Sequence, residues 1–183
     1  MWYLNGIERF KTSETPAIVE RTRVRTFRQL WEYSEKLAAE LIKLPGKSPV
    51  VIYGDKNPDM VITMTAALKA GRAYVPVDVS YPLTRLMYIS EKVEACAIFN
   101  FSSVEVEGDF RIFSEEETAA IFARDYEGEV SKDNWVDFED TCYILFTSGS
   151  TGEPKGVQIS KKNIMVYKTW FDKELRTASH GQH

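Results

Sequence analysis

Residues 142–156 read Cys142-Tyr143-Ile144-Leu145-Phe146-Thr147-Ser148-Gly149-Ser150-Thr151-Gly152-Glu153-Pro154-Lys155-Gly156. The first five form an apolar run that predicts a buried strand. The other ten, residues 147–156, carry four hydroxyl groups, three glycines and one lysine, and no large apolar side chain. Such a segment has no large apolar side chain that could fix it by packing in the core. Its backbone N–H groups, hydroxyls and positive charge are instead the groups that bind a phosphate. The stretch therefore predicts a phosphate-binding loop directly after a strand, and residues 147–156 are called the phosphate loop below.

The plainer interpretation of the phosphate loop is a flexible Ser/Gly turn between two strands. Two features favour phosphate binding instead. Hydroxyls fill every non-glycine position up to Gly152, and Pro154 stiffens the approach to Lys155. The segment is not a Walker A loop, which needs Gly, four residues, and then Gly-Lys-Ser/Thr. Counted from Gly149, Pro154 stands where the second glycine should be.

Strand-like and helix-like segments alternate along the rest of the chain. Short apolar or β-branched runs predict strands at 50–53, 73–77, 96–101, 111–113, 141–146 and 157–159, and a small hairpin at 17–19 and 23–25. Apolar periodicity predicts helices within 1–14 and at 26–44, 57–70, 82–93, 114–123 and 160–175, with a polar linker at 127–134. The alternation predicts an α/β fold with a mostly parallel sheet and helices on both faces. The phosphate loop would follow the carboxyl end of a strand, where open α/β sheets bind ligands.

Two of the predicted helices carry clear boundary signals. Thr26 and Gln29 match a capping box, in which each side chain bonds the other residue's backbone N–H. Asn57 before Pro58 is an N-cap followed by a proline in the first helical turn, and Gly71 stands where a left-handed residue ends that helix. The helix between them is apolar nearly all round, so we expect it to be buried on more than one side.

Other apolar side chains predict which surfaces face the core. In the first segment Ile7 and Phe10 are expected to pack inward. Cys96 and Cys142 fall in strand-like runs, where reduced and buried thiols are expected. The helix that follows Thr26 has an apolar stripe at helical spacing, formed by Leu30, Leu37, Leu41 and Leu44.

Composition limits the classes of protein that fit. With 183 residues, 44% of them hydrophobic and 13% aromatic, the chain suits one ordinary domain with a substantial core. Basic and acidic residues are well mixed, 23 against 27, which argues against a nucleic-acid partner. There is no apolar run of 18 residues and no signal peptide, so we expect a cytoplasmic protein without a membrane partner. His180 and His183 lie in a polar end, where no metal site is expected.

Two motifs resemble a known family. Residues 143–156, from the strand through the phosphate loop, look like the signature loop of the AMP-forming adenylating enzymes, the ANL superfamily. Upstream, Leu68-Lys69-Ala70-Gly71-Arg72-Ala73-Tyr74-Val75-Pro76-Val77-Asp78 is similar to a structural motif of the branch that activates amino acids. The family's weak N-terminal motif is present near residues 26–30 in a divergent form. Long motifs in the right order and at plausible spacing favour membership over chance.

Finer resemblance favours the D-alanine–carrier protein ligases within this superfamily. Residues 156–160 and 48–54 are similar to that group, and so is Trp170 in the last predicted helix. Peptide-synthetase adenylation domains commonly place a histidine-containing segment after the loop. This chain has Ser160-Lys161-Lys162-Asn163 there instead, which argues mildly against that group.

The resemblance implies a fold, a reaction and a set of contacts. The fold is the N-terminal subdomain of the acyl-adenylate-forming enzymes, expected over residues 1–176 with a flexible tail at 177–183. The reaction joins an amino acid, D-alanine by the closest resemblance, to ATP with Mg²⁺, and passes the acyl group to a phosphopantetheine carrier protein. The family's catalytic Lys has no counterpart in this chain. The implied phosphate contacts are Thr147, Ser148, Gly149, Ser150, Thr151, Gly152 and Lys155.

Three interpretations remain open at the level of sequence. The resemblance spans about residues 7–175 and much less than half of the family's enzyme. The chain is then the N-terminal part of an amino-acid-adenylating ligase, inactive when isolated, or the same part of a peptide-synthetase adenylation domain. The third interpretation is a truncated, non-catalytic protein that binds a partner through the face that the missing part of the enzyme would cover. An exposed apolar patch of several hundred Å² would favour it.

Overall fold

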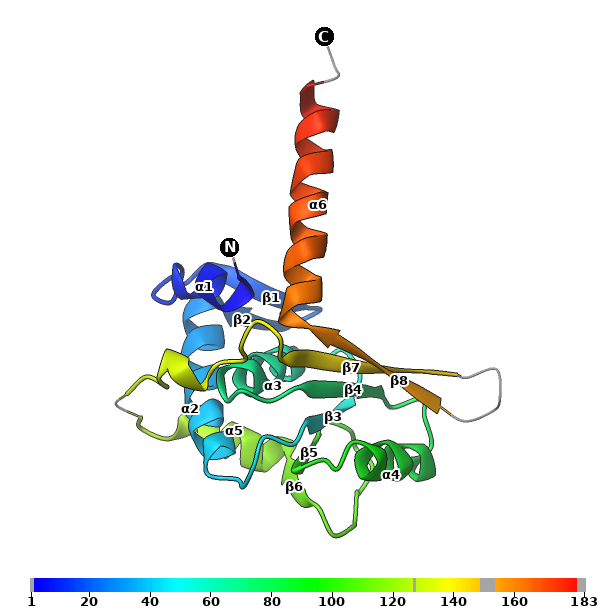
Figure 1. Cartoon of the computed structure of the whole chain (residues 1–183). Helices are drawn as coiled ribbons and strands as arrows, with labels where there is room; N and C mark the ends of the chain where they lie inside the picture. Colours follow the sequence, from blue (N-terminus) through cyan, green and yellow to red (C-terminus); the bar gives the residue numbers. More distant parts are fainter. Residues whose placement is uncertain (1, 127, 149–153, 181–183) are drawn as a thin grey trace.

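The computed structural model describes residues 2–126, 128–148 and 154–180. The main sheet has the strand order β6-β5-β3-β4-β7-β8, while β1 and β2 form a separate antiparallel hairpin. Neighbouring strands run parallel from β6 to β7, and β8 is antiparallel to β7 (Figure 1). In chain order the elements are α1 (Tyr3–Glu8), β1 (Pro16–Glu20), β2 (Arg23–Thr26), α2 (Phe27–Ile42), β3 (Val50–Gly54), α3 (Pro58–Lys69), β4 (Tyr74–Asp78), α4 (Leu83–Lys92), β5 (Ala97–Asn100), β6 (Arg111–Ser114), α5 (Glu115–Ala123), the 3₁₀ helix η1 (Lys132–Asn134), β7 (Thr141–Ser148), β8 (Pro154–Ser160) and α6 (Lys161–His180).

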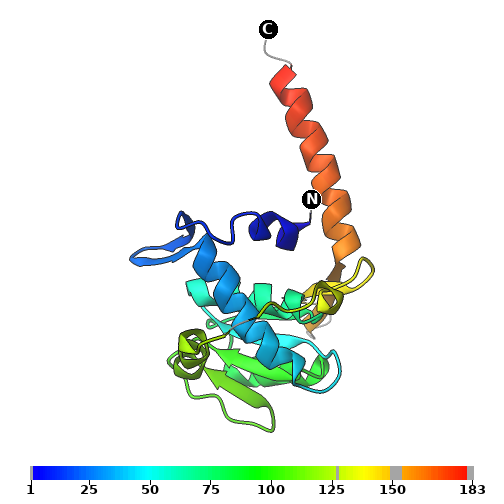
Figure 2. The ribbon, with the colours of Figure 1, turned by 90° about the vertical axis from the view of Figure 1, so that its left-hand side faces the viewer.

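Helices cover both faces of the main sheet (Figures 1 and 2). On one face α2, α3 and α5 form an apolar cluster with the sheet that includes Leu37, Ile62 and Phe99, all fully buried. On the other face α4 contributes Leu86 to a second cluster, with Val75 of β4. The fold is therefore α/β with a mostly parallel sheet between helices, as the sequence predicted. The last helix, α6, leaves the end of β8 and points away from both layers.

The helix boundaries read from the sequence are confirmed. Thr26 Oγ1 accepts from the Gln29 N–H at 3.2 Å, and Gln29 Oε1 accepts from the Thr26 N–H at 3.0 Å. The Asn57 side chain caps α3 by accepting a backbone N–H two residues on, at 2.9 Å. Of the 12 residues of α3, 10 are buried. Gly71 follows with φ +68°, and a Cβ there would lie 2.5 Å from the Asn134 backbone oxygen, so glycine is required.

A buried ion pair joins α2 to α3. Lys69 Nζ donates to Glu35 Oε1 at 2.6 Å, with 0% and 3% of the two side chains exposed. The second carboxylate oxygen accepts the Val130 backbone N–H at 2.6 Å. Lys69 Nζ also lies 3.4 Å from the centroid of the Trp31 ring, in cation–π contact. Burial lowers the pKa of Lys69 to about 8, and the neighbouring Glu35 carboxylate opposes that shift.

Arg72, which is 1% exposed, closes the carboxyl end of α2. Its Nη2 group donates to the carbonyls of Leu44 at 2.7 Å and Leu41 at 3.2 Å, and Nη1 donates to Ser48 O at 3.0 Å. The last carbonyls of a helix have no partner within the helix. The buried guanidinium of Arg72 therefore donates hydrogen bonds to backbone carbonyls that would otherwise need water as a partner.

Two expectations about the ends of the chain differ from the structure. Phe10 was expected to pack inward, but α1 ends at Glu8 and Phe10 is 51% exposed. Its ring lies at the surface beside Phe27, with ring centroids 5.2 Å apart. At the other end, α6 continues to His180, past the predicted end near residue 175. The separation of residues 177–183 as a flexible tail stays a prediction.

The apolar run at 142–146 is only half buried, which corrects the prediction of a buried strand. Cys142 and Ile144 are buried, but Leu145 is 44% exposed. The register between β4 and β7 consists of the pair Tyr74 and Tyr143, whereas β8 pairs with β7 along its whole length. The outer part of β7 therefore forms a two-stranded ribbon with β8, and such a ribbon leaves apolar side chains open to solvent.

Candidate phosphate-binding site

Strands β7 and β8 hold the two ends of the phosphate loop. Their antiparallel register ends with Thr147 opposite Lys155 and Ser148 opposite Pro154. Thr147 and Lys155 are both exposed. Residues directly opposite on antiparallel strands point to the same face, with Cβ atoms about 4.5–5.5 Å apart. The base of the loop therefore presents a hydroxyl group and an ammonium group side by side.

The structure brings together three of the seven predicted contacts. Thr147, Ser148 and Lys155 are placed by the β7–β8 pairing. The other four lie outside the described residues, namely Gly149, Ser150, Thr151 and Gly152. That all seven bind phosphate stays a prediction.

A carboxylate that the sequence analysis did not single out lies at the same edge of the sheet. β4 and β7 run parallel, so their carboxyl ends meet at one edge. From the paired Tyr74 and Tyr143, both Asp78 and Thr147 lie four residues further along. Hydrogen bonds from the hydroxyl and the amide of Ser80 lower the pKa of the Asp78 carboxyl, the amide donating at 2.8 Å.

An ionised Asp78 sets a requirement on any phosphate bound nearby. Alone it would repel a phosphate group, so a cation must balance it. Lys155 supplies one positive charge at the loop base, and a carboxylate oxygen also suits Mg²⁺. A carboxylate and an ammonium group at the ends of neighbouring strands are the kinds of group that a phosphate bound with Mg²⁺ would need. The position could have been noticed in the sequence, because Asp78 ends the second family-like motif.

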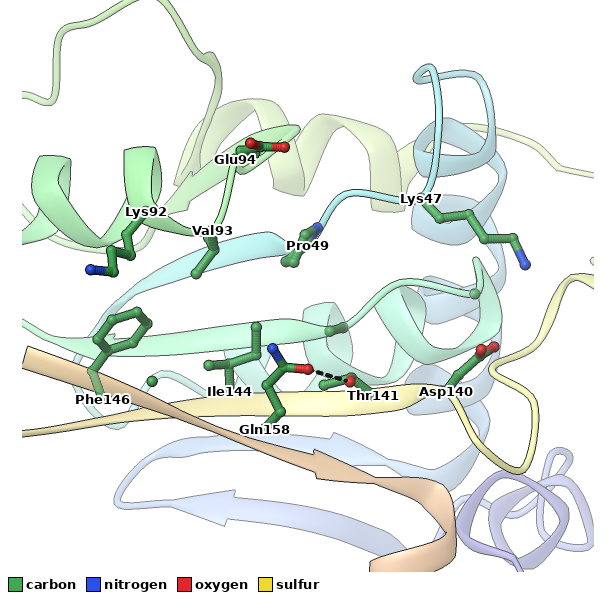
Figure 3. Close-up of a pocket in the computed structure, with 13 residues that line it drawn as sticks. Lys47, Pro49, Lys92, Val93, Glu94, Asp140, Thr141, Ile144, Phe146 and Gln158 are labelled. Atoms are coloured by element: carbon green, nitrogen blue, oxygen red, sulfur yellow. Dashed lines mark hydrogen bonds between the residues drawn. The ribbon is translucent and has the colours of Figure 1, made fainter.

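A hollow of about 530 Å³ opens on the opposite face of the β7–β8 ribbon (Figure 3). Ile144, Phe146 and Gln158 line it from the ribbon, and Pro49 lines it from the start of β3. Because side chains alternate along a strand, these ribbon residues face away from Thr147 and Lys155. The hollow also lacks a net charge that would attract an anion, since its charged residues are Lys47, Lys92, Glu94 and Asp140. The loop base remains the better candidate.

Other kinds of site find less support. Across residues 2–126, 128–148 and 154–180, no three His, Cys, Asp or Glu side chains gather as metal ligands. None of the helices in the described part is long and apolar enough to cross a bilayer. Burial raises the pKa of Cys142 to about 11 and raises that of Cys96. Both thiols therefore stay protonated near neutral pH and are poor nucleophiles.

Fold and loop together define a class of protein. It is an α/β subdomain in which a glycine- and hydroxyl-rich loop joins the parallel part of a sheet to its antiparallel edge strand. The family described as AMP-binding enzyme matches residues 8–181, nearly the whole chain. The chain belongs to this family of ATP-using enzymes and corresponds to its N-terminal portion.

Curated relatives point to one branch of the family. The chain is 38% identical over 153 residues to the D-alanine--D-alanyl carrier protein ligase of Bacillus velezensis, covering 82% of this chain and 30% of the relative. It is 35% identical over 171 residues to the enzyme of the same description from Staphylococcus aureus strain Newman, covering 92% of this chain and 34% of the relative. The chain spans about a third of the length of these relatives.

Solved structures agree on the fold. The N-terminal subdomain of Klebsiella oxytoca NpsA, in complex with 3-hydroxybenzoyl-AMSN, has a TM-score of 0.67 and 26% identity. The match covers 86% of this chain and 40% of that one. The AMPPNP-bound nonribosomal peptide synthetase FmoA3 has a TM-score of 0.72 and 19% identity, covering 86% of this chain and 17% of that one. At that identity the second likeness speaks for the fold alone.

Proposed function

We propose that this chain is the ATP-phosphate-binding part of a ligase that activates an amino acid as its adenylate, with D-alanine as the amino acid and a carrier protein as the acceptor. The observation that carries the proposal is the cross-strand pair of Thr147 and Lys155 at the base of the phosphate loop. The choice of D-alanine and of a carrier protein comes from the described activity of the relatives that are 35–38% identical.

The proposed chemistry explains the residue types in the loop. The carboxylate of the amino acid attacks the α-phosphorus of ATP, and pyrophosphate leaves as negative charge builds on its oxygens. Fixed N–H groups, hydroxyls and positive charge stabilise that charge, and bound Mg²⁺ would share this role. Lys155 supplies the positive charge. The hydrogen-bond donors are the hydroxyls of Thr147, Ser148, Ser150 and Thr151 and the amides of Gly149 and Gly152.

The isolated chain is proposed to bind phosphate without completing the reaction. It spans about a third of its curated relatives. The amino-acid pocket and the catalytic Lys implied by the family resemblance have no counterpart in its sequence. We therefore expect no amino-acid-dependent exchange of pyrophosphate into ATP from residues 1–183 alone. Robust exchange by the isolated chain would contradict this part of the proposal.

A chimera tests the function directly. The chain replaces the matching third of the Bacillus velezensis ligase, and pyrophosphate exchange into ATP is measured with D-alanine, L-alanine and a fatty acid. We expect exchange with D-alanine above the other two substrates. Exchange with the fatty acid but not with amino acids would overturn the substrate class. A soluble, folded chimera without any exchange would count against the adenylating function itself.

Lys155 provides the sharper test within the same chimera. Replacing it (Lys155→Ala) removes positive charge beside the leaving phosphates, so the exchange rate should fall by about 10²–10³-fold, the loss typical of one transition-state donor. The matched control is Lys162→Ala, which removes an exposed lysine paired with Glu139 at 3.0 Å on the first turn of α6. The control should change the rate less than about twofold. Equal effects of the two substitutions would contradict the assigned role of Lys155.

A second function would use the apolar surface that the described part of α6 exposes. The outer turns of α6 expose several large apolar side chains, among them Trp170 at 55% and Tyr167 at 63%. Soluble surfaces rarely gather such residues unless they meet a partner. A non-catalytic, partner-binding role therefore remains the second candidate for the isolated chain.

A further inference from the structure

Backbone pairing holds the β7–β8 ribbon to the rest of the sheet near its base. In the described residues β4 pairs with β7 at Tyr74 and Tyr143, whose rings stack across the joint with centroids 5.6 Å apart. Thr147 lies four residues beyond Tyr143 along β7, a distance of roughly 13 Å in an extended strand. Side-chain packing therefore has to hold the base of the phosphate loop in place relative to the sheet.

The two faces of the ribbon differ in what they contact. On one face Ile144 and Phe146 join the apolar cluster that α4 forms with the sheet. Figure 3 shows both of these side chains on the same side of the ribbon. The other face carries Thr147 and Lys155, and there Leu145 is 44% exposed. Phe146 is thus the last side chain before the phosphate loop that packs against the body of the domain.

Phe146 lies directly opposite Gly156 in the β7–β8 register, next to the pair of Thr147 and Lys155. A Cβ built on Gly156 would lie 3.1 Å from Cζ of the Phe146 ring and 3.1 Å from Cγ2 of Ile144. The edge of the ring therefore occupies the space that a side chain at position 156 would need. The φ angle of Gly156 is not in the left-handed region, so the glycine serves this close approach and not the backbone conformation.

The contact between ring and glycine joins both strands to the domain. A glycine inside a strand weakens it, because it has no side chain to pack against its neighbours. An aromatic ring from the opposite strand can replace the missing contact. Since Phe146 also packs in the cluster with α4, the same ring fixes β8 through Gly156 and β7 through its own backbone. A shift of the ring would change the separation and the angle between Thr147 and Lys155.

We propose that Phe146 and Gly156 are positioning residues for the phosphate loop. The ring of Phe146, packed on Gly156, holds Thr147 and Lys155 at the spacing at which both reach the phosphates of ATP. The inference rests on the proposed function, because it takes these two residues as phosphate contacts. The ring itself does not touch the phosphates, since it lies on the other face of the ribbon. Its effect is nevertheless large, because a displacement of about 1 Å at a reacting group can cost about 10²-fold in rate.

The substitution Phe146→Ala in the ligase chimera described above tests the role of the ring. The kcat of D-alanine-dependent exchange should fall by about 10- to 100-fold, with a smaller change in the KM for ATP, because the misplaced groups act mainly as charge builds on the leaving phosphates. The matched control is Leu145→Ala, which truncates the preceding residue on the exposed face. It should change kcat less than about twofold. Equal losses in the two variants would overturn the inference.

Two further substitutions separate positioning from filling of the core. Phe146→Tyr keeps the ring and should keep kcat close to that of the parent chimera. Phe146→Leu keeps an apolar side chain in the cluster with α4 but lacks the ring atoms that lie beside Gly156. Its thermal midpoint should therefore lie closer to the parent than that of Phe146→Ala, while its exchange stays slow. Full recovery of exchange by Phe146→Leu would assign the residue to the core alone and contradict the inference.

A disulfide measures the geometry of the loop base without ATP. The substitutions Thr147→Cys and Lys155→Cys are combined in the 183-residue chain, since opposite Cβ atoms about 4.5–5.5 Å apart are close to what a disulfide needs. Equilibrium with glutathione gives the effective concentration of the two thiols, and mass spectrometry separates this disulfide from any formed by the native cysteines. Adding Phe146→Ala should lower the effective concentration at least about 10-fold, and adding Leu145→Ala less than about twofold. Equal values for the two would overturn the inference.

The two measurements distinguish failure of the inference from failure of the proposed function. A folded parent chimera without exchange contradicts the adenylating function, and the disulfide equilibrium then decides whether Phe146 positions the loop base. Exchange by the parent that Phe146→Ala leaves unchanged contradicts the inference and leaves the proposed function standing.

Discussion

Around α2 and α3 charged side chains are buried and paired, whereas along β7, β8 and α6 apolar side chains are exposed. Glu35, Lys69 and Arg72 are at most 3% exposed, and hydrogen bonds engage each of them. Leu145 and Trp170 are 44% and 55% exposed. In the first region the buried charged groups are hydrogen-bonded, although Arg72 Nε has no partner among the described residues, while the second region leaves large apolar side chains exposed. The contrast separates a part of the chain whose core is closed from a part whose apolar side chains face solvent in the described residues.

The position of each strand explains the contrast. β3 has β4 on one side and β5 on the other, and all five of its residues are buried. β7 has β8 along its length but meets β4 at one pair only in the described residues. A parallel strand between two helical layers hides both of its faces. A two-stranded ribbon that leaves the sheet buries neither of its faces completely. Substitutions around β3 should therefore lower the free energy of unfolding more than substitutions around β7.

Breaking the buried ion pair should give the largest effect. Glu35→Leu leaves the Lys69 ammonium group buried without its carboxylate, so the free energy of unfolding should fall by about 3–5 kcal/mol. Asp172→Asn, which removes an exposed ion pair on α6, should cost less than about 0.5 kcal/mol. Urea unfolding measures both. The double variant Glu35→Leu/Lys69→Met should recover most of the loss, and a failure to recover would point to packing as the cause.

The loss in free energy of unfolding on truncating an apolar side chain should differ between the two regions by several kcal/mol. Leu37→Ala empties a fully buried position of α2 and should cost about 2–5 kcal/mol. Trp170→Ala removes a larger side chain from α6, yet the monomer should lose less than about 0.5 kcal/mol because little of that surface is buried. Thermal and urea unfolding of dilute protein give both values. A cost above about 2 kcal/mol for Trp170→Ala would show that α6 already packs against the body.

The buried lysine should make stability rise with pH. The pKa of Lys69 is about 8 in the folded chain and has an ordinary value of 10.5. Between these values the unfolded state binds more protons, so the stability contributed by Lys69 increases as pH rises from 8 towards 10.5, by up to about 1.4 kcal/mol per unit. Urea unfolding at pH 8 and pH 10 checks this against Glu35→Leu/Lys69→Met, which lacks both groups. An unchanged difference between the two proteins would refute the lowered pKa.

Helices α2 and α6 are capped in the same way, but removing the two caps should lower the free energy of unfolding by different amounts. These changes are the smallest of those predicted. Thr26→Ala removes the cap of α2 and should lower the free energy of unfolding by about 1 kcal/mol. Ser160→Ala removes the cap of α6, where the serine hydroxyl accepts the Asn163 N–H at 3.2 Å. Because α6 can fray without unfolding the body, we expect reduced helical circular dichroism and a global change below about 0.5 kcal/mol. Equal global costs would contradict the division into two regions.

The sequence was informative where a signal lies within a few neighbouring residues. Thr26, Asn57 and Gly71 marked helix ends correctly because capping depends on local chemistry. Glu35 and Lys69 were missed because their pairing joins positions 34 residues apart. The burial of Leu145 was predicted wrongly, since a short apolar run is the same whether its strand has neighbours on both sides or on one.

The candidate site was predictable in composition and not in geometry. Hydroxyls, glycines and one lysine identified the phosphate loop without any structure. That Thr147 and Lys155 face each other depends on the β7–β8 register, which a sequence does not reveal. Asp78 was not singled out because it lies on another strand, 69 residues before Thr147, and only the parallel pairing puts the carboxyl ends of both strands at one edge of the sheet.

Arg72 links the end of α2 to the order in which the chain is made. It lies 24 residues after Ser48 and 31 residues after Leu41, whose carbonyls it binds. A chain emerging from the ribosome therefore exposes α2 before the group that closes its end has emerged. Arrested nascent chains should show this as protease-sensitive α2 until the segment through β4 has emerged, and Arg72→Met should prolong that sensitivity. A translation pause after α2 has emerged and before Arg72 has emerged would thus lengthen the period in which this helix is open to proteases and chaperones.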